Sequence, residues 1–289
     1  MHKAEYMSCE IIDDSDEESN VSNNINTNNN INTNNNINNI NTNNIIKNKK
    51  IIKTKQIQSL LQTYHSEEEK IIEIGVDEVG RGPLFGRVYT AAVILPKDNS
   101  FDHSKMKDSK KFHSKKKIEE VAKYIKENAL AWYISFEDEK TVDDINILQA
   151  TQKSMHHSIL ETRRNFNKIQ KEKGLEELID YNYNLLIDGN YFKPITVLNK
   201  KTNRFENIPY VMIEGGDNKY SAIAAASILA KVERDHYIDL LCEENPTLST
   251  YYGIDSNKGY GAKRHLDGIK EHGITIWHRR SFGICKNYV

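Results

Sequence analysis

The sequence predicts an α/β protein whose core is a mixed five-stranded sheet with helices on both faces. Two observations support this fold class. Three strand-like apolar segments come first, and strand-like and helix-like segments then alternate as far as residue 241. In addition, the acidic residues that interrupt these apolar segments fall where the strand-like segments end. A sheet with a polar, acidic edge is therefore expected.

The segment over residues 71–96 holds the first two strands and the strongest functional signal. It begins as an apolar, β-branched run, which is typical of a buried strand, and it reaches Asp77 and Glu78 at its end. A Gly-Arg-Gly-Pro turn at 80–83 interrupts it, and Val88 to Leu95 predicts the second strand. Adjacent carboxylates have no role in folding here, because burying unpaired carboxylates is costly. A metal site explains them.

A dense basic run, MKDSKKFHSKKK from Met106, leads into the first helix. Ser114 is the expected N-cap, and the apolar residues of this helix form one stripe, made of Ile118, Val121, Ala122 and Ile125. Lysines at this density usually form a solvated surface. A ridge that binds a nucleic-acid duplex is the alternative.

Residues 129–136 are apolar and aromatic enough for a third strand. A long helix is predicted over residues 141–172. Its expected buried side carries Ile145, Leu148, Met155 and Ile159.

Two short strands complete the predicted sheet, at Asn184–Ile187 and Ile208–Ile213. Residues 221–241 then predict a helix whose first half, SAIAAASILAKV, is small and apolar nearly all round. Such a helix must be buried against the sheet.

Residues 1–48 predict a disordered, Asn-rich tail. From Asn23 onward the tail is Asn with Thr, and Ile returns every six residues, which meets neither the helical nor the strand period. Such a segment buries too little apolar area to offset the entropy of ordering it. A self-associating segment is the alternative. Residues 49–70 are basic, then helix-like, then acidic, and form either a linker or an N-terminal helix packed on the domain.

The net charge of -1 is unevenly distributed. Residues 71–289 carry 33 basic and 31 acidic groups, and residues 256–289 carry seven Lys or Arg against two acidic residues. This basic C-terminal segment is compatible with a surface that follows phosphates. The alternative is a solvated charged face.

Cysteine usage and the lack of targeting signals indicate an intracellular protein. Cys9, Cys242 and Cys285 show neither metal-ligand nor disulfide-framework spacing, which is typical of a reducing compartment. No apolar run approaches the roughly 20 residues that span a bilayer. The N-terminus is acidic where a secretory or mitochondrial signal would be basic. We expect a cytoplasmic protein with no membrane partner, and a nuclear location remains an alternative.

Four acidic residues fall at or just beyond strand ends: Asp77, Glu78, Asp188 and Asp217. In open α/β sheets ligands bind at the carboxyl ends of neighbouring strands, so carboxylates far apart in sequence can meet there. Hard oxygen ligands without accompanying Cys or His favour Mg²⁺ or Mn²⁺. The chemistry that needs such a cluster is phosphodiester hydrolysis with two divalent ions roughly 3.5–4 Å apart.

Each carboxylate alone is a weaker signal. An isolated Asp at a strand end is more often a turn or helix cap, and this alternative applies to Asp188 in DGN and to Asp217 in GGDN. Capping does not explain the adjacent pair Asp77 and Glu78.

Seven blocks of the sequence resemble ribonuclease HII in order and in spacing. They are GVDEVGRGPLFGRVYTAAVIL, KDSKK, LLIDGN, GGDNKYSAIAAASILAKVERD, NKGYGAKRH, EHG and HRRSFG. The resemblance covers residues 71–283, and DEVGRGP and AAASILAKVERD are its most specific parts. It implies a ribonuclease-H-like catalytic domain over residues 71–245 and a basic helical extension over residues 246–289. It also implies a metal-dependent endonuclease that cuts RNA paired with DNA, including single ribonucleotides embedded in duplex DNA.

The resemblance also assigns roles to residues. The four metal-binding catalytic acids of the family fall on Asp77, Glu78, Asp188 and Asp217. Its glycine-arginine-glycine loop, whose backbone reads the ribose 2′-hydroxyl, falls on Gly80, Arg81 and Gly82. Glycines permit the close backbone approach that this needs, and the 2′-hydroxyl is what separates RNA from DNA.

The family's junction tyrosine falls on Tyr260. Its ring is expected to pack on the next deoxyribose and to reject a ribose. Without the resemblance, an aromatic residue between two glycines would carry no clear meaning.

The sequence departs from the family pattern at two places. Residues 191–207 form a longer segment than in compact bacterial members, which changes the substrate groove or a partner surface without moving a ligand. Gly261 and Ala262 stand where many members have proline and threonine, which puts a phosphate contact there in doubt.

Two other functions are compatible with this fold. One is a catalytically inactive protein that binds RNA–DNA hybrids, which the presence of all four acids disfavours. The other is a different ribonuclease-H-fold nuclease, such as a resolvase or transposase, which the glycine loop and Tyr260 disfavour. We expect a monomer, and no protein partner is indicated.

Overall fold

The computed structural model describes residues 61–68, 70–174, 182–199 and 202–288. The predicted tail over residues 1–48 lies outside the described residues, as does the greater part of the segment 49–70. Residues 57–289 group into one compact unit, and the description below is of that unit.

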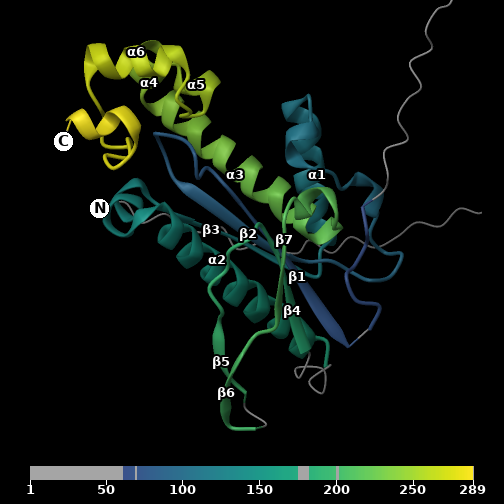
Figure 1. The fold of residues 1–289 in the computed structure, drawn as a ribbon. Helices are drawn as coiled ribbons and strands as arrows, with labels where there is room; N and C mark the ends of the chain where they lie inside the picture. The colour runs from purple at the N-terminus through teal and green to yellow at the C-terminus, as the bar shows by residue number, and fades with distance from the viewer. Residues whose placement is uncertain (1–60, 69, 175–181, 200–201, 289) are drawn as a thin grey trace, which may run out of the picture. The chain divides into compact units, whose positions relative to one another are not determined.

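The described strands form the expected mixed five-stranded sheet (Figure 1). Its order is β3-β2-β1-β4-β7, with β1 and β2 antiparallel, β2 and β3 antiparallel, and β1, β4 and β7 parallel. The bounds are β1 Ile71–Val79, β2 Val88–Ile94, β3 Ala131–Glu137, β4 Asn182–Asp188 and β7 Tyr210–Ile213. The predicted fold class is confirmed, and the strand ends agree with the expected ones to within about two residues.

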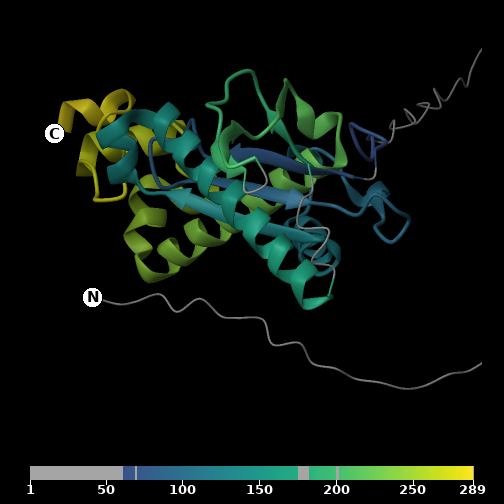
Figure 2. The same cartoon turned by 90° about the horizontal axis from the view of Figure 1, so that it is seen from below.

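Two long helices cover opposite faces of this sheet (Figure 2). On one face α3 (Ser221–Glu244) and α1 (Lys115–Asn128) pack with β2 around one apolar cluster. On the other, α2 (Glu139–Glu172) packs against β1 and β4 in a second cluster. The helix that is small and apolar all round is α3, and its first ten residues, Ser221 to Ala230, are all buried. Ser114 caps α1 as expected.

The backbones of β1 and α3 come unusually close at Gly75. A methyl group at this position would lie 2.5 Å from the Ile223 nitrogen and would also meet the Ala222 backbone. A glycine two residues before Asp77 therefore lets α3 lie directly on the strand that carries the first carboxylates. This contact explains why the start of α3 consists of small residues.

The predicted buried side of α2 is correct in part. Met155 and Ile159 are buried, but Ile145 is 38% exposed and Leu148 is half-buried. The cause is Asn146, whose φ of 66° and ψ of 160° break the helix about two turns after its start. The residues before this break are rotated relative to the rest, so that Val142 is buried in place of Ile145.

The C-terminal residues form a helical extension at the far end of α3, as expected (Figure 1). It consists of α4 (Pro246–Tyr252), α5 (Ile254–Asn257), α6 (Lys263–His272) and a final 3₁₀ turn, Gly283–Tyr288. Its apolar cluster includes Leu248, Ile254 and Ile269 and is completed by Phe85 from the loop between β1 and β2. This loop is thereby tied to the extension.

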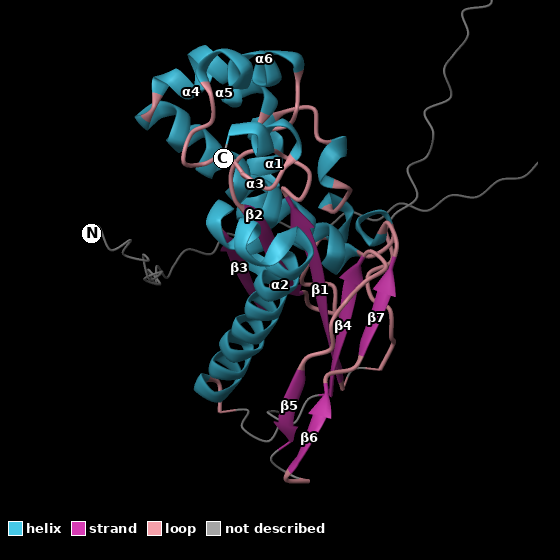
Figure 3. Cartoon of the chain, turned by 60° about the vertical axis from the view of Figure 1, so that its left-hand side comes forward, coloured by secondary structure: helices cyan, strands magenta, loops and turns pink. Residues whose placement is uncertain are grey.

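A two-stranded antiparallel sheet, β5 (Thr196–Asn199) with β6 (Arg204–Asn207), was not predicted. It lies in the long segment after Asp188 and projects beyond β4 and β7, away from α4 to α6 (Figure 3). No residue of either strand is buried, and the register pair Leu198 and Phe205 is exposed, so the buried apolar face that marks a strand in a sequence is missing.

Residues 61–68 contain no helix and run along the domain. Gln62 forms a bridge with Tyr220, and the buried carboxylate of Glu73 accepts hydrogen bonds from the backbone nitrogens of His65 and Ser66 at 2.6–3.1 Å. No helix in the described part of the chain is long and apolar enough to cross a membrane.

Candidate active site

Asp77 and Asp188 lie side by side on neighbouring parallel strands. The last registered pair of β1 and β4 is Val76 with Ile187, and each aspartate is the next residue of its strand. Side chains alternate across a strand. Asp77 thus points to the α3 side, where the nearby Ser227 hydroxyl lowers its pKa against the larger effect of burial. The Ser227 Oγ atom lies 3.0 Å from Ser109 Oγ. The parallel pairing predicts this juxtaposition, and the structure shows it.

Glu78 faces the glycine loop. Its Oε1 accepts a hydrogen bond from Arg81 at 3.1 Å, and its own amide donates to Asp77 Oδ1 at 2.7 Å. Arg81 therefore partly neutralises the carboxylate that precedes its own loop. Its side chain is half exposed, so the ion pair contributes little stability.

Asp217 follows β7 in a 3₁₀ turn, Gly216–Asn218, directly before α3. The amide of Gly216 donates to Asp188 Oδ1 at 2.7 Å, and this bond brings the turn to the end of β4. Asp217 is buried and accepts a hydrogen bond from Asn218, which also donates to Asp108 and accepts one from Lys111. The basic run before α1 thus reaches the same edge of the sheet as the acids.

The acids influence one another electrostatically. Burial, together with the charges of Glu78 and Asp188, raises the pKa of Asp77 well above its usual value. Burial also raises the pKa of Glu78 against the opposing effect of Arg81, and burial with Asp108 and Asp188 raises the pKa of Asp217. Because the charge of Asp188 contributes to the shift at each of these three groups, the acids form one electrostatic cluster.

Lys110 is the cation that responds to this cluster. Burial alone would lower its pKa, but the negative charges of Asp217, Asp108, Asp77 and Asp188 raise it overall. A lysine ammonium group is thereby held in its charged form beside the acids.

The four carboxylates have the chemistry of a site for a hard divalent ion, but they are not drawn together in this structure. No group of three or more His, Cys, Asp or Glu among the described residues is arranged so that it could hold a metal ion as it stands. Each acid already accepts a hydrogen bond, from Glu78, Arg81, Gly216 or Asn218. The negative charges of the carboxylates also repel one another, and a bound cation would replace this repulsion by attraction. The donor set therefore fits Mg²⁺ or Mn²⁺ once the side chains turn inward.

The glycine loop and Tyr260 meet, although about 180 residues separate them. Gly80 has a φ of +89°, and a methyl group there would lie 2.7 Å from Arg234 Cδ and 2.9 Å from the Arg87 carbonyl. Gly82 faces the ring of Tyr260, whose Cε1 would be 3.5 Å from a methyl group at that position. Tyr260 is 49% exposed and therefore accessible to a ligand. Glu78 thus adjoins the loop through Arg81, and the loop adjoins Tyr260 through Gly82.

Two buried arginines, which were not among the predicted site residues, hold the loop. Arg279 is fully buried and donates to the carbonyl oxygens of Gly80, Arg81, Pro83 and Gly86 at 2.6–3.1 Å. Arg234 on α3 donates to three further carbonyl oxygens, of Phe85, Arg87 and Lys258. Both lie in blocks that carry the family resemblance, HRRSFG and AKVERD, and this was the only signal.

The comparison with known protein families decides the family. The model described as ribonuclease HII matches residues 74–285. This chain belongs to the ribonuclease HII family. The expectation of a type HII ribonuclease is therefore confirmed at the level of the family, and the rival reading as a resolvase or transposase is not supported.

Individual relatives agree with this assignment. The chain is 39% identical over 214 residues to ribonuclease HII of Bacteroides thetaiotaomicron, covering 74% of this chain and 90% of the relative. It is 42% identical over 208 residues to ribonuclease HII of Pelagibacter ubique, covering 72% of this chain and 94% of the relative. The crystal structure of ribonuclease H2 from Pyrococcus horikoshii OT3 superimposes with a TM-score of 0.51 at 19% identity, covering 75% of this chain and 96% of that one. This likeness confirms the ribonuclease-H-like fold.

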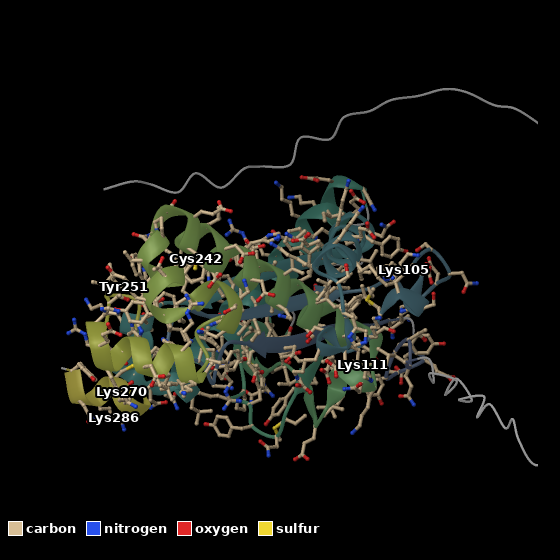
Figure 4. The ribbon with its side chains drawn as sticks, turned by 90° about the horizontal axis from the view of Figure 1, so that it is seen from above. Lys105, Lys111, Cys242, Tyr251, Lys270 and Lys286 are labelled. Carbon is tan, nitrogen blue, oxygen red and sulfur yellow. The ribbon has the colours of Figure 1, made fainter. Side chains whose placement is uncertain are left out.

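Basic side chains occur at both ends of the ribonuclease HII domain. Figure 4 shows Lys105 and Lys111 on one side of the molecule and Lys270 and Lys286 on the other. Only the first group approaches the acids, through the contact of Lys111 with Asn218. The basic run before α1 is therefore the better candidate for a surface that contacts nucleic acid near the site.

Proposed function

We propose that this protein hydrolyses the RNA strand of RNA–DNA hybrids and cuts at ribonucleotides embedded in duplex DNA. The observation that carries the proposal is the proximity of the Tyr260 ring to Gly82, in a loop that starts two residues after Glu78. Reacting groups and a surface that can distinguish ribose from deoxyribose are thereby adjacent. Family membership supports the same function.

Asp77, Glu78, Asp188 and Asp217 would hold two divalent ions, Mg²⁺ or Mn²⁺. When bound, such ions supply Lewis-acid chemistry for adding water across a phosphodiester bond. The carboxylates provide hard oxygen ligands from three different segments of the sheet edge. Lys110, kept charged by the same acids, is placed to attract the phosphates of the substrate.

The glycine loop would read the ribose through its backbone. Arg279 occupies carbonyl oxygens of Gly80, Arg81 and Pro83, so the hydrogen-bonding capacity of the loop toward a ligand lies in its amide groups. A 2′-hydroxyl can accept from an amide, whereas a deoxyribose offers no such atom. The neighbouring Tyr260 ring would then cover the sugar on the 3′ side of the cut and favour a deoxyribose there.

Cleavage of a duplex DNA with one embedded ribonucleotide, in Mg²⁺, Mn²⁺ or EDTA, tests this function directly. We expect cleavage at the ribonucleotide with either ion, none in EDTA, and none of an all-DNA duplex. Asp77→Asn should lower turnover by more than about a hundredfold, because even loss of an outer partner of a metal ligand costs about 10–100-fold.

A matched control is Asp98→Asn, which makes the same change on an exposed loop after the opposite end of β2. It should keep wild-type turnover. A wild-type protein that binds the duplex without cutting it would instead establish the inactive hybrid-binding alternative. The monomeric state and the intracellular location stay predictions.

A further inference from the structure

Two histidines are fully buried and in contact with each other between the glycine loop and the C-terminal extension. His265 lies in the first turn of α6, and His278 lies in the segment after it. Their Nε2 atoms are 3.1 Å apart. Phe85 and Tyr252 pack against both rings, with centroids 5.1–6.4 Å away. In the part of the chain that the structure describes, neither imidazole contacts a carboxylate, and the proposed chemistry uses neither of them.

The hydrogen bonds of this pair can run in only one direction. The backbone N–H of Thr275 donates to His278 Nδ1 at 2.9 Å, so this nitrogen must be an acceptor. A neutral His278 then carries its proton on Nε2 and donates to His265 Nε2. His265 in turn carries its proton on Nδ1, which lies 2.8 Å from the Tyr260 carbonyl oxygen. The chain of donors starts at a fixed backbone N–H and ends on the backbone of Tyr260.

The pair is neutral, as this direction requires. Burial lowers the pKa of His265, and burial together with His265 lowers the pKa of His278 to about 3. The titratable side chain packed against both rings is that of Tyr252. The two tautomers are therefore those that the hydrogen bonds select.

The same C-terminal segment also holds the glycine loop. His278 forms a β-bridge with Phe85, the Arg279 amide donates to the Leu84 carbonyl, and the Arg279 guanidinium binds the loop carbonyls described above. On the other side, the Leu84 amide donates to the Gly259 carbonyl. Two adjacent residues of this segment thus act on different parts of the site. Arg279 binds the glycine loop, and His278 binds His265, which in turn binds the Tyr260 carbonyl.

We propose that His265 and His278 are positioning residues that hold Tyr260 at its distance from Gly82 through this directed chain of hydrogen bonds. The inference rests on the proposed role of Tyr260 in recognising the sugar on the 3′ side of the cut. Without the bond to its carbonyl, Tyr260 would keep its ring but lose the orientation of the ring relative to the loop. Discrimination between sugars would then fall, although every group that touches the substrate is still present.

The first test is spectroscopic and needs no substrate. The full chain, labelled with ¹⁵N in its histidines, is studied by NMR at neutral pH, with single His→Gln variants to assign the rings. We expect His265 with its proton on Nδ1 and His278 with its proton on Nε2. The opposite tautomer at either residue, or a charged imidazole, would overturn the proposal whether or not the enzyme cuts its substrate.

The second test uses two conservative replacements of one residue. His265→Asn retains a donor near the position of Nδ1, and His265→Gln retains an amide near Nε2 but has none that reaches the Tyr260 carbonyl. Cleavage is compared on duplexes with a deoxynucleotide or a ribonucleotide 3′ of the cut. The preference for deoxyribose should stay within about threefold of wild type in the Asn variant. It should fall by about tenfold or more in the Gln variant, toward that of Tyr260→Ala.

Melting temperatures separate positioning from simple loss of packing. Both variants should melt lower than wild type, because each leaves one buried partner unsatisfied. Equal preferences in the two variants, or a preference retained in the Gln variant, would contradict the proposal. Failure of the wild-type protein to cut at any ribonucleotide would refute the proposed function. The NMR measurement of the two tautomers would still test the hydrogen-bond chain in that case.

Discussion

The buried charged residues around the proposed site lie in two different environments. Arg234 and Arg279 are buried and have no carboxylate partner among the described residues, and their guanidinium groups donate to backbone carbonyl oxygens. Asp77 and Asp217 are buried beside other acids, and burial and the neighbouring charges raise the pKa values of both. The arginines therefore stabilise the loop, whereas the acids are held at a cost to stability that a bound cation would offset.

Asp77→Asn should make the metal-free protein more stable at neutral pH. The folded-state pKa of Asp77 lies above its unfolded value of about 3.9, so the folded state binds more protons between the two values. The stability of the wild type must then fall as pH rises through this window, and the substitution removes that loss. Melting temperatures in EDTA across pH 4–8 measure the effect.

The advantage of Asp77→Asn should disappear toward pH 4, where the wild-type carboxyl is protonated as well. A mutant that melts below wild type at neutral pH without metal would show that the Asp77 carboxylate stabilises the fold. That result would count against the assignment of Asp77 as a metal ligand that is held at a cost to stability.

Tyr260→Ala should reduce cleavage at a single embedded ribonucleotide by roughly ten- to a hundredfold. Stacking of an aromatic ring on a nucleotide is worth about 1–3 kcal/mol, which corresponds to this change in rate. The loss should appear on substrates with a deoxynucleotide 3′ of the cut, because that is the sugar the ring would cover. Kinetics on matched duplexes provide the measurement.

The matched variant Tyr260→Phe keeps the ring, and its rate of cleavage should stay near that of the wild type. Because Tyr260 is half exposed, neither change should lower the melting temperature by more than a few degrees. Wild-type cleavage by the Ala variant, or its unfolding, would remove Tyr260 from the proposed site.

At the scale of elements, α3 organises the site. Its first turn packs on β1 at Gly75, Ser227 reaches Asp77 one and a half turns later, and Arg234 reaches the glycine loop after two further turns. A single straight helix thus fixes the relative positions of the first carboxylate and the substrate-reading loop. Any displacement of α3 from the sheet would alter both.

Gly75→Ala should destabilise the domain by about 3 kcal/mol or more. Inserted methyl groups in packed interiors typically cost about 1–3 kcal/mol, and here the obstacles are backbone atoms of Ala222 and Ile223, which cannot change rotamer. Chemical denaturation gives the free energy of unfolding. Gly261→Ala is the control, since its new methyl group would be 3.7 Å from Leu84, an ordinary contact. Equal stability of the two variants would show that the approach of α3 to β1 is not tight.

At the scale of the whole molecule, every proposed site residue lies between Asp77 and Tyr260. Residues 61–68 are bound to this unit through Glu73, Lys97 and Tyr220. The extension after α3 contributes Tyr260 and encloses the loop through Phe85. The proposed site residues therefore extend from the first strand to the extension, and none of them lies in the Asn-rich segment.

Deleting Met1 to Asn48 should leave turnover on a short hybrid within a few-fold of wild type. The deleted segment supplies none of the proposed ligands, and its composition predicts no packed structure. Steady-state cleavage by the full chain and by the shortened chain, at equal concentration, provides the comparison. A loss of hundreds-fold would assign the tail a role in catalysis or substrate binding. A deletion that continued into residues 61–68 would be a poor test, because it would also remove the contacts with Glu73.

The sequence by itself determined the element types of the main sheet and its long helices, and it predicted the chemistry of the proposed site. Apolar periodicity predicted the five strands of the main sheet and the long helices, because burial of one face or of both is encoded by neighbouring residues. The pairing of Asp77 with Asp188 could also be predicted, because parallel neighbouring strands end at a common edge. The blocks of family resemblance pointed to the four acids, the glycine loop and Tyr260.

Only the tertiary structure decided which distant residues touch. The contact of Tyr260 with Gly82, the arginines that bind the loop carbonyls and the buried histidine pair all join segments far apart in the chain. Local patterns carry no information about such contacts, since a buried arginine or histidine looks like a surface one in sequence. The phase of α2 was mispredicted for a related reason. A single left-handed residue, Asn146, resets the helical period, and a backbone angle is chosen by packing on the whole domain.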